Sequence, residues 1–295
     1  MQLPDTARWR PRLALGLMSL LLAASAPALA ALHAIGPDAQ GVGRLFTDLD
    51  EPTTALALGD GSMAFNGGLT FSTADGRFYA IANDSLGQSV LTSFSGADPA
   101  ALSTPITLGS GFVGGLAAQG RRLYAVAQDF SGAASLYRVD GGGASLVGAL
   151  GGGLYGGLTY NPRDGLLYGI AADDAGVQRR LVAIDAEAAG GPGTTVLFDL
   201  GDGSRAFQGG LAWDDRDGRF VAIANDATGG SQLVAFASSG PGSLVDLATP
   251  LGPGYINAGL AWTAPAVPEP QAALLLLAGL AALAWRRRQR PSPLP

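Results

Sequence analysis

The sequence contains no cysteine and no lysine, and it has one histidine in 295 residues. Without cysteine the chain forms no disulfide, carries no thiolate nucleophile and offers no cysteine ligand to a metal. A serine hydrolase triad needs a histidine, and we expect the single one, His33, at a half-exposed strand position. No Walker-type phosphate loop occurs either. We therefore expect a protein that is not an enzyme.

Basic charge is scarce in the central part of the chain. All 18 basic residues are arginines, and several of them lie in the two terminal segments. Residues 31–267 keep 11 arginines against 22 acidic residues, which gives a net charge near −11. Such an acidic body is unsuited to nucleic acid or to an anionic membrane as a partner.

Residues 1–30 have the three parts of a secretory signal peptide. Arginines precede an apolar run, and the segment ends in an A-x-A site formed by Ala28 and Ala30. The pattern predicts cleavage by signal peptidase and a mature N-terminus at Ala31. The alternative is an ordinary buried helix.

A second apolar run, residues 271–285, lies near the other end of the chain. As a helix it would be about 22 Å long, which is short for a hydrocarbon core of roughly 30 Å. The arginines of residues 286–295 would hold its end in the cytoplasm and leave the body on the periplasmic side. We expect a transmembrane helix, joined to the body by a linker at residues 264–270.

This tail resembles the PEP-CTERM sorting signal of Gram-negative bacteria, since a short motif, an apolar helix and a basic cluster follow in order. The matching residues are Val267, Pro268, Glu269, Pro270, Arg286, Arg287 and Arg288. The resemblance implies processing by an exosortase, transient contact with the inner membrane, and a final place at the cell surface or outside the cell. Bearers of the signal are typically exported by bacteria that make extracellular polysaccharide. The alternative is a plain single-pass anchor.

Between the two ends the sequence repeats five times. Each unit has a Gly-Gly-Leu or Ala-Gly-Leu core, an Asp-Gly or similar turn, an aromatic-rich strand, a third strand and a fourth strand that leads to an LGxG turn. The repeated leucines are Leu69, Leu116, Leu158, Leu211 and Leu260, with spacings of 47, 42, 53 and 49 residues. Four short strands per unit predict an all-β, five-bladed β-propeller over residues 31–263. The alternative is a β-sandwich.

The fifth unit is completed from the N-terminus. Residues 32–50 align with residues 123–140, so the N-terminus supplies the second and third strands of the closing blade and residues 52–59 its fourth. The C-terminal segment 256–262 supplies the first strand. Sharing one blade between the two ends closes the ring and removes its open edges. It also places both ends on the Asp-Gly face, which would point towards the membrane while the tail is anchored.

Aspartate ends the second strand of every unit. These residues are Asp38, Asp84, Asp129, Asp173 and Asp226. One interpretation is a set of ligands for calcium or for sugar hydroxyls, because carboxylates suit hard cations. The favoured one is an Asx-type turn, because one carboxylate per blade is far from the six to eight oxygens that calcium takes.

A second group of polar residues is expected around the opening on the LGxG face. It comprises Asn66, Tyr155, Gln208 and Asn257, with Asp60 and Asp202 in two LGDG turns. Amides, a phenol and carboxylates are suited to binding sugar hydroxyls. Solvated turns and strand ends in a closed channel are the plainer interpretation.

Three functions remain open at this point. The first is a surface binding module for polysaccharide or another surface protein. The second is a structural protein of the envelope or biofilm matrix that binds nothing. The third, a glycosidase, needs two carboxylates near the axis, and no first strand is expected to carry Asp or Glu.

Overall fold

The computed structural model describes residues 31–38, 42–49, 54–112, 115–153, 155–173, 178–253, 255, 258–263 and 279–280. The signal peptide, the sorting motif and the basic end predicted from sequence lie outside the described residues. Of the apolar run 271–285, only residues 279 and 280 are described, and both are helical. Within these described ranges, no helix has the length and apolar character needed to cross a membrane.

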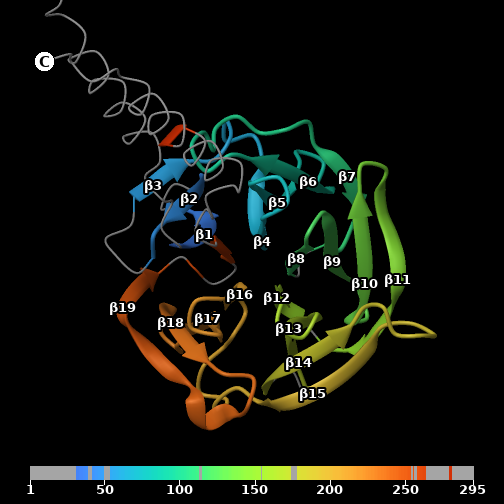
Figure 1. The fold of residues 1–295 in the computed structure, drawn as a ribbon, viewed down its shortest axis with the longest axis vertical. Coiled ribbons are helices and arrows are strands. Elements are labelled where there is room, and N and C mark those ends of the chain that lie inside the picture. Colours follow the sequence, from blue (N-terminus) through green and yellow to red (C-terminus); the bar gives the residue numbers. More distant parts are fainter. Residues whose placement is uncertain are drawn as a thin grey trace, which may run out of the picture. The chain divides into compact units, whose positions relative to one another are not determined.

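Five four-stranded sheets are arranged as blades around a central axis (Figure 1). The closing blade has the order β20 (Gly259–Thr263), β1 (Ala31–Pro37), β2 (Gly43–Thr47) and β3 (Thr54–Ala57). The second blade is β4 (Ala64–Ser72), β5 (Arg77–Asn83), β6 (Ser89–Phe94) and β7 (Ile106–Gly109). The third is β8 (Leu116–Gln119), β9 (Arg122–Gln128), β10 (Ala133–Asp140) and β11 (Gly143–Gly152).

The last two blades repeat the same order. The fourth is β12 (Tyr155–Asn161), β13 (Leu166–Ala172), β14 (Arg179–Asp185) and β15 (Gly193–Asp199). The fifth is β16 (Leu211–Asp214), β17 (Arg219–Asn225), β18 (Gly230–Phe236) and β19 (Val245–Pro253), with the short 3₁₀ helix η1 (Pro241–Ser243) before β19. The predicted five-bladed propeller is therefore confirmed.

The closing blade joins the two ends of the described body. Strands β1 and β20 pair antiparallel, from Ala31 opposite Thr263 to Ile35 opposite Gly259. The shared blade predicted from the alignment of residues 32–50 is confirmed, and both ends lie on the face of the Asp-Gly turns. Residues 30–264 form one compact unit, so the ring closes with its own strands.

The core lies between the blades. Five clusters of buried side chains are present, and each one joins two neighbouring blades. Between the fourth and fifth blades, for example, Tyr168 packs on Phe220 and Phe220 on Phe236, with ring centroids 4.6 and 5.7 Å apart. Burial of apolar surface between all five blades holds the ring together.

Glycine immediately before the first strands β8 and β16 allows the blades to approach each other at the axis. A Cβ atom on Gly115 would lie 1.9 Å from the backbone nitrogen of Leu158 in the next blade, and one on Gly210 would lie 2.1 Å from that of Leu260. No side chain fits in such a gap, so the repeated glycine follows from backbone crowding.

One expectation about the first strands was wrong. Strand β16 extends to Asp214, whose side chain is fully buried. Its Oδ1 accepts the backbone N–H groups of Arg216 and Asp217, at 3.0 and 3.2 Å. Asp214 therefore ends a first strand because its carboxylate caps the following turn.

Candidate functional site

The two LGDG turns hold their aspartates in the same way. The backbone N–H of Ser62 donates to Asp60 Oδ1, and that of Ser204 to Asp202 Oδ1, each at 2.9 Å. Hydrogen bonding from the side chain of each serine, and then from its backbone N–H, lowers the pKa of both aspartates below the ordinary value. Both carboxylates are exposed and ionised at neutral pH.

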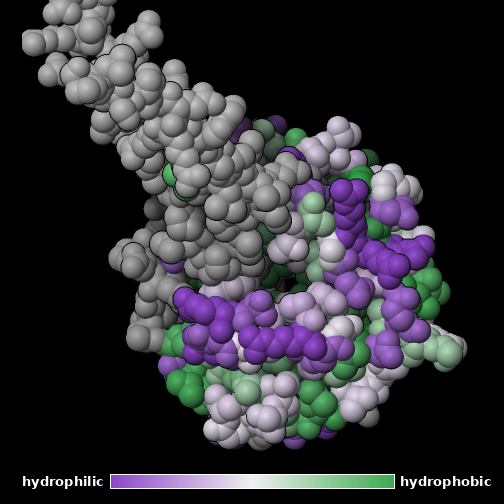
Figure 2. Space-filling view, in the orientation of Figure 1, coloured by the Kyte–Doolittle hydropathy of each residue, from purple (hydrophilic) through white to green (hydrophobic). Residues whose placement is uncertain are grey.

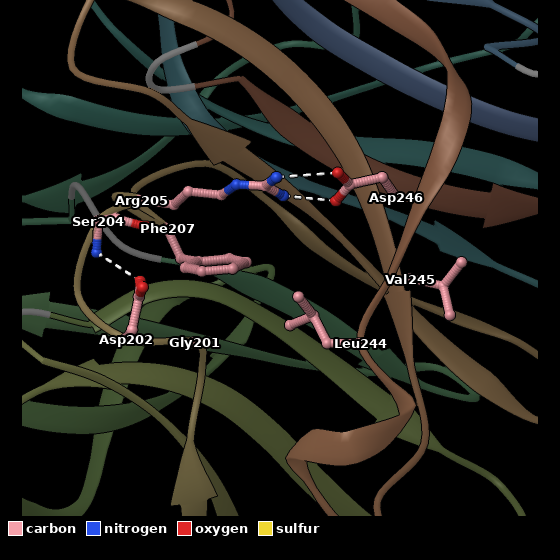
Figure 3. Close-up of a pocket in the computed structure, with 8 residues that line it drawn as sticks. All are labelled: Gly201, Asp202, Ser204, Arg205, Phe207, Leu244, Val245 and Asp246. Atoms are coloured by element: carbon pink, nitrogen blue, oxygen red, sulfur yellow. Dashed lines mark hydrogen bonds and ion pairs between the residues drawn. The ribbon is translucent and has the colours of Figure 1, made fainter.

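Asp202 lies at the edge of a surface hollow of about 510 Å³, which we call the fifth-blade hollow (Figure 3). The turn before β16 supplies one wall, and the segment from η1 into β19 supplies the other. The lining residues are Gly201, Asp202, Ser204, Arg205, Phe207, Leu244, Val245 and Asp246. This volume lies within the roughly 300–1,000 Å³ of small-molecule sites.

A two-pronged ion pair crosses the hollow from one wall to the other (Figure 3). The Arg205 guanidinium donates to both carboxylate oxygens of Asp246, with Nη2 2.8 Å from Oδ2. These bonds raise the pKa of Arg205 and lower that of Asp246. The side chains stay 37% and 46% exposed, so both retain room for further hydrogen bonds.

The charges and the floor of the hollow define what it can accept. Two carboxylates face one guanidinium, which leaves one net negative charge, so an anionic ligand is disfavoured. The half-buried Leu244 supplies apolar surface, whereas Phe207 is only 1% exposed and belongs to the core between the fourth and fifth blades. The arrangement suits a neutral molecule with hydroxyl groups on one side and C–H groups on the other.

Arg205 distinguishes the two LGDG turns. Residues 58–65 read LGDGSMAF and residues 200–207 read LGDGSRAF. Met63, at the matching position of the second blade, packs against the core there. The second blade, whose LGDG turn is the closest internal repeat, thus lacks the arginine that forms the ion pair of the fifth-blade hollow.

A smaller cavity of about 170 Å³ lies where the first strands end. Side chains from all five blades line it, and among them Phe71, Tyr160, Trp213 and Trp262 stand two residues after the repeated leucines. Arg163 lies over the ring of Trp213 and Arg216 over that of Trp262, at 5.4 and 5.2 Å from the ring centroids. A volume below the usual ligand range and covered indole faces make this cavity the less suitable site.

The predicted axial group is not gathered at one place. Tyr155 is buried between the third and fourth blades, and its hydroxyl donates to the carbonyl of Leu150 at 3.4 Å. Gln208 is exposed and lines neither cavity. Asn257 and the side chain of Asn66 lie outside the described residues. Of the predicted residues whose side chains the structure describes, Asp202 alone lines the fifth-blade hollow, and Asp60 occupies the equivalent turn of another blade.

The repeated aspartates hold the loops between second and third strands. Asp129 Oδ1 accepts the N–H groups of Ser131 and Ala133, at 2.8 and 3.0 Å, and Asp226 Oδ1 those of Thr228 and Gly230, at 2.8 and 2.9 Å. The side chains of Asp38, Asp84 and Asp173 also accept backbone N–H groups. These are the bonds of Asx-type turns. Over the described ranges, no three metal-ligating side chains cluster as an ion site would require.

His33 lies at the join between the two ends of the chain. Its Nε2 is 3.3 Å from Thr263 Oγ1, and its ring meets Phe78 edge-on at 4.9 Å. Burial lowers the pKa of His33 from 6.5 to about 4, because the charged form would lose its water. The residue is neutral at physiological pH and belongs to the structure of the closing blade.

Arg205 and Asp246 are not among the site residues predicted from sequence. A signal for Arg205 was present, since comparing the two LGDG turns singles it out against Met63. No sequence signal marks Asp246, because it is 41 residues away from Arg205 and the two meet only when the fifth blade has folded.

Comparison with known families identifies the tail. Residues 266–288 match the PEP-CTERM protein-sorting motif. The chain thus carries this motif, which implies an exported protein of the cell surface that an exosortase processes. No curated protein sequence gives a significant match.

Solved structures share the fold of the body. The structure of a nidogen/laminin complex gives a TM-score of 0.52 at 14% identity, over 79% of this chain and 99% of that one. The SapL1 lectin in complex with alpha methyl fucoside gives 0.52 at 11% identity, over 85% and 88%. A putative TolB from Agrobacterium tumefaciens gives 0.51 at 13% identity, over 79% and 90%. At these identities the likeness concerns the fold alone.

Proposed function

We propose that this exported protein is a non-enzymatic binding module of the cell surface that holds a neutral sugar of extracellular polysaccharide in the fifth-blade hollow. The observation that supports the proposal is the Arg205–Asp246 pair, which spans a hollow of about 510 Å³ that is also lined by Asp202. Polar groups from two walls converge there on one space.

Sugar hydroxyls match these groups. A hydroxyl donates one hydrogen bond and accepts others, so adjacent hydroxyls can donate to Asp246 or Asp202 and accept from Arg205. Bonds to ionised partners are the stronger kind, and the low pKa of both aspartates keeps them ionised. The apolar C–H face of a pyranose can lie against Leu244.

The comparison with a lectin supports the scaffold only. SapL1 presents a site for methyl fucoside on a similar fold. The sugar chemistry proposed here depends on this chain's own residues. Because the hollow has a net negative charge, we expect neutral sugars to bind and negatively charged uronates to be rejected.

The proposal is tested by binding of residues 30–264 to an array of neutral and uronate-containing oligosaccharides, followed by calorimetry on the best neutral one. Arg205→Met copies the second blade and should weaken binding at least about tenfold, or about 1.4 kcal/mol. Asp202→Ala should also weaken it, while its matched control Asp60→Ala in the other LGDG turn should leave it unchanged.

Three results would contradict the proposal. If Arg205→Met bound the sugar as tightly as the unmodified protein, the fifth-blade hollow would not be the binding site. If the folded protein bound no neutral glycan, the alternative function, a structural protein of the envelope or matrix, would be favoured instead. Turnover of chromogenic glycosides would make the protein an enzyme.

A further inference from the structure

We infer that the outer edge of β15 is a self-association surface, on which the β15 strand of a second copy pairs antiparallel. This inference is independent of the proposed sugar site. It depends on the exposure of β15, on its sequence and on the contrast with the outer strands of the other four blades.

Strand β15 is an open sheet edge with an apolar centre. It pairs with β14 on one side, and six of its seven residues are exposed. Val196 is 56% exposed and Leu197 38% exposed. Figure 2 shows hydrophobic side chains at the rim of the propeller, where the outer strands run.

The sequence of β15 lacks the charges and prolines that usually protect the middle of an edge strand, and the only irregularity in its pairing with β14 is one register shift between Val196 and Phe198. Residues 193–198 read GTTVLF, with no charge and no proline, and are rich in β-branched and aromatic residues. The single charge, Asp199, is at the end of the strand and pairs with Arg180 of β14 at 3.1 Å. Such a segment favours pairing with another strand.

The other outer strands are protected in recognisable ways. Strands β3 and β7 have only four residues each. Strand β19 carries Asp246 and two prolines. The long strand β11 is approached by the neighbouring blade, since a Cβ on its Gly148 would lie 2.4 Å from Cδ of Pro192. Very short strands, charges, prolines and covering loops are the devices by which edges avoid association.

A second copy of β15 fits this edge because the strand is complementary to itself. An antiparallel pair centred on Val196 sets Val196 opposite its own copy and Thr195 opposite Leu197 of the partner. Asp199 then faces Gly193, so no like charges meet across the pair. The same two-fold arrangement brings the exposed Val196 side chains of both copies together, as an isologous interface requires.

A strand pair of this length makes a small interface, so the association is weak and reversible. We expect a dissociation constant between about 1 μM and 1 mM. On a surface where the protein is concentrated, two copies would present their binding faces together and gain avidity.

Engineered cysteine gives the sharpest test, because the chain has no cysteine of its own. Val196→Cys in residues 30–264 should form a disulfide-linked dimer on mild oxidation, since the paired Cβ atoms would lie about 4.5–5.5 Å apart. Val245→Cys is the matched control, because Val245 is also an outer-strand valine and is 58% exposed. Cross-linking at least about tenfold faster at position 196 is the expected result.

Sedimentation without cross-linking completes the test. The unmodified protein should show dimer that increases with concentration, Val196→Lys should remain monomeric, and Val245→Lys should associate as the unmodified protein does. A protein that stays monomeric up to millimolar concentration, or equal cross-linking at positions 196 and 245, would overturn the inference. Thermal unfolding of each variant separates lost association from lost folding.

Discussion

Ala31 and Thr263 are joined by two hydrogen bonds across 232 residues of sequence. The backbone N–H of Ala31 donates to Thr263 Oγ1 at 3.2 Å, and the same hydroxyl donates to the carbonyl oxygen of Ala31 at 3.1 Å. This hydroxyl therefore fastens the first residue of β1 to the last residue of β20. The ring of blades closes at this point.

Removing the hydroxyl should loosen the closure. We expect Thr263→Val, which keeps the shape of the side chain, to lower the free energy of unfolding by about 1–2 kcal/mol through the loss of these hydrogen bonds. Urea unfolding followed by tryptophan fluorescence measures the change. Thr263→Ser keeps the hydroxyl and should recover most of the loss; a serine variant as unstable as the valine variant would speak against this explanation.

The glycines beside the axis predict a larger effect on stability. Gly115→Ala would place a methyl group 1.9 Å from Leu158 N, so the third and fourth blades must separate. We expect a loss of about 3 kcal/mol or more, or failure to fold. Gly141→Ala is the control, because a Cβ there meets nothing within 4 Å, and it should change stability by less than about 0.5 kcal/mol.

The architecture was predictable because the repeat is carried by features that every blade needs. The Gly-Gly-Leu or Ala-Gly-Leu core marks the crowded axis, the Asp-Gly turns mark the hairpins, and residues 32–50 resemble the second and third strands of a complete unit. Each of these features is a short, continuous stretch of chain. Local patterns of this kind survive in a single sequence.

The candidate site was predictable only in part. Asp202 was singled out by its turn, but Arg205 and Asp246 meet across a whole blade, and no local pattern records such a contact. Tyr155 was expected at the axial opening, whereas successive residues of a strand point to opposite faces and this one turns into the core between two blades. Sequence periodicity therefore gave the strands and not the direction of each side chain.

Arg163 links the fourth blade to the fifth. Its guanidinium lies over Trp213 and its Nε is 3.4 Å from Asp215 Oδ1. We expect Arg163→Ala to lower the free energy of unfolding by about 0.5–1 kcal/mol, the usual contribution of an exposed cation–π contact. Arg138, exposed on β10 and not stacked on any ring in the described blades, is the control and should tolerate alanine. Equal losses at the two positions would mean that the stacking contributes nothing.

The pKa of His33 makes the closure sensitive to acid. In the folded protein this pKa is lowered to about 4, whereas the unfolded chain has an ordinary value near 6.5. Between these values the unfolded state binds more protons than the folded state, so the free energy of unfolding rises with pH through this window. The stability that depends on neutral His33 is therefore lost as the pH falls from 6.5 to 4. Urea titrations at pH 4.5, 5.5 and 7 should show this slope. His33→Gln should flatten it, and an unchanged slope in that variant would assign the acid sensitivity to other groups.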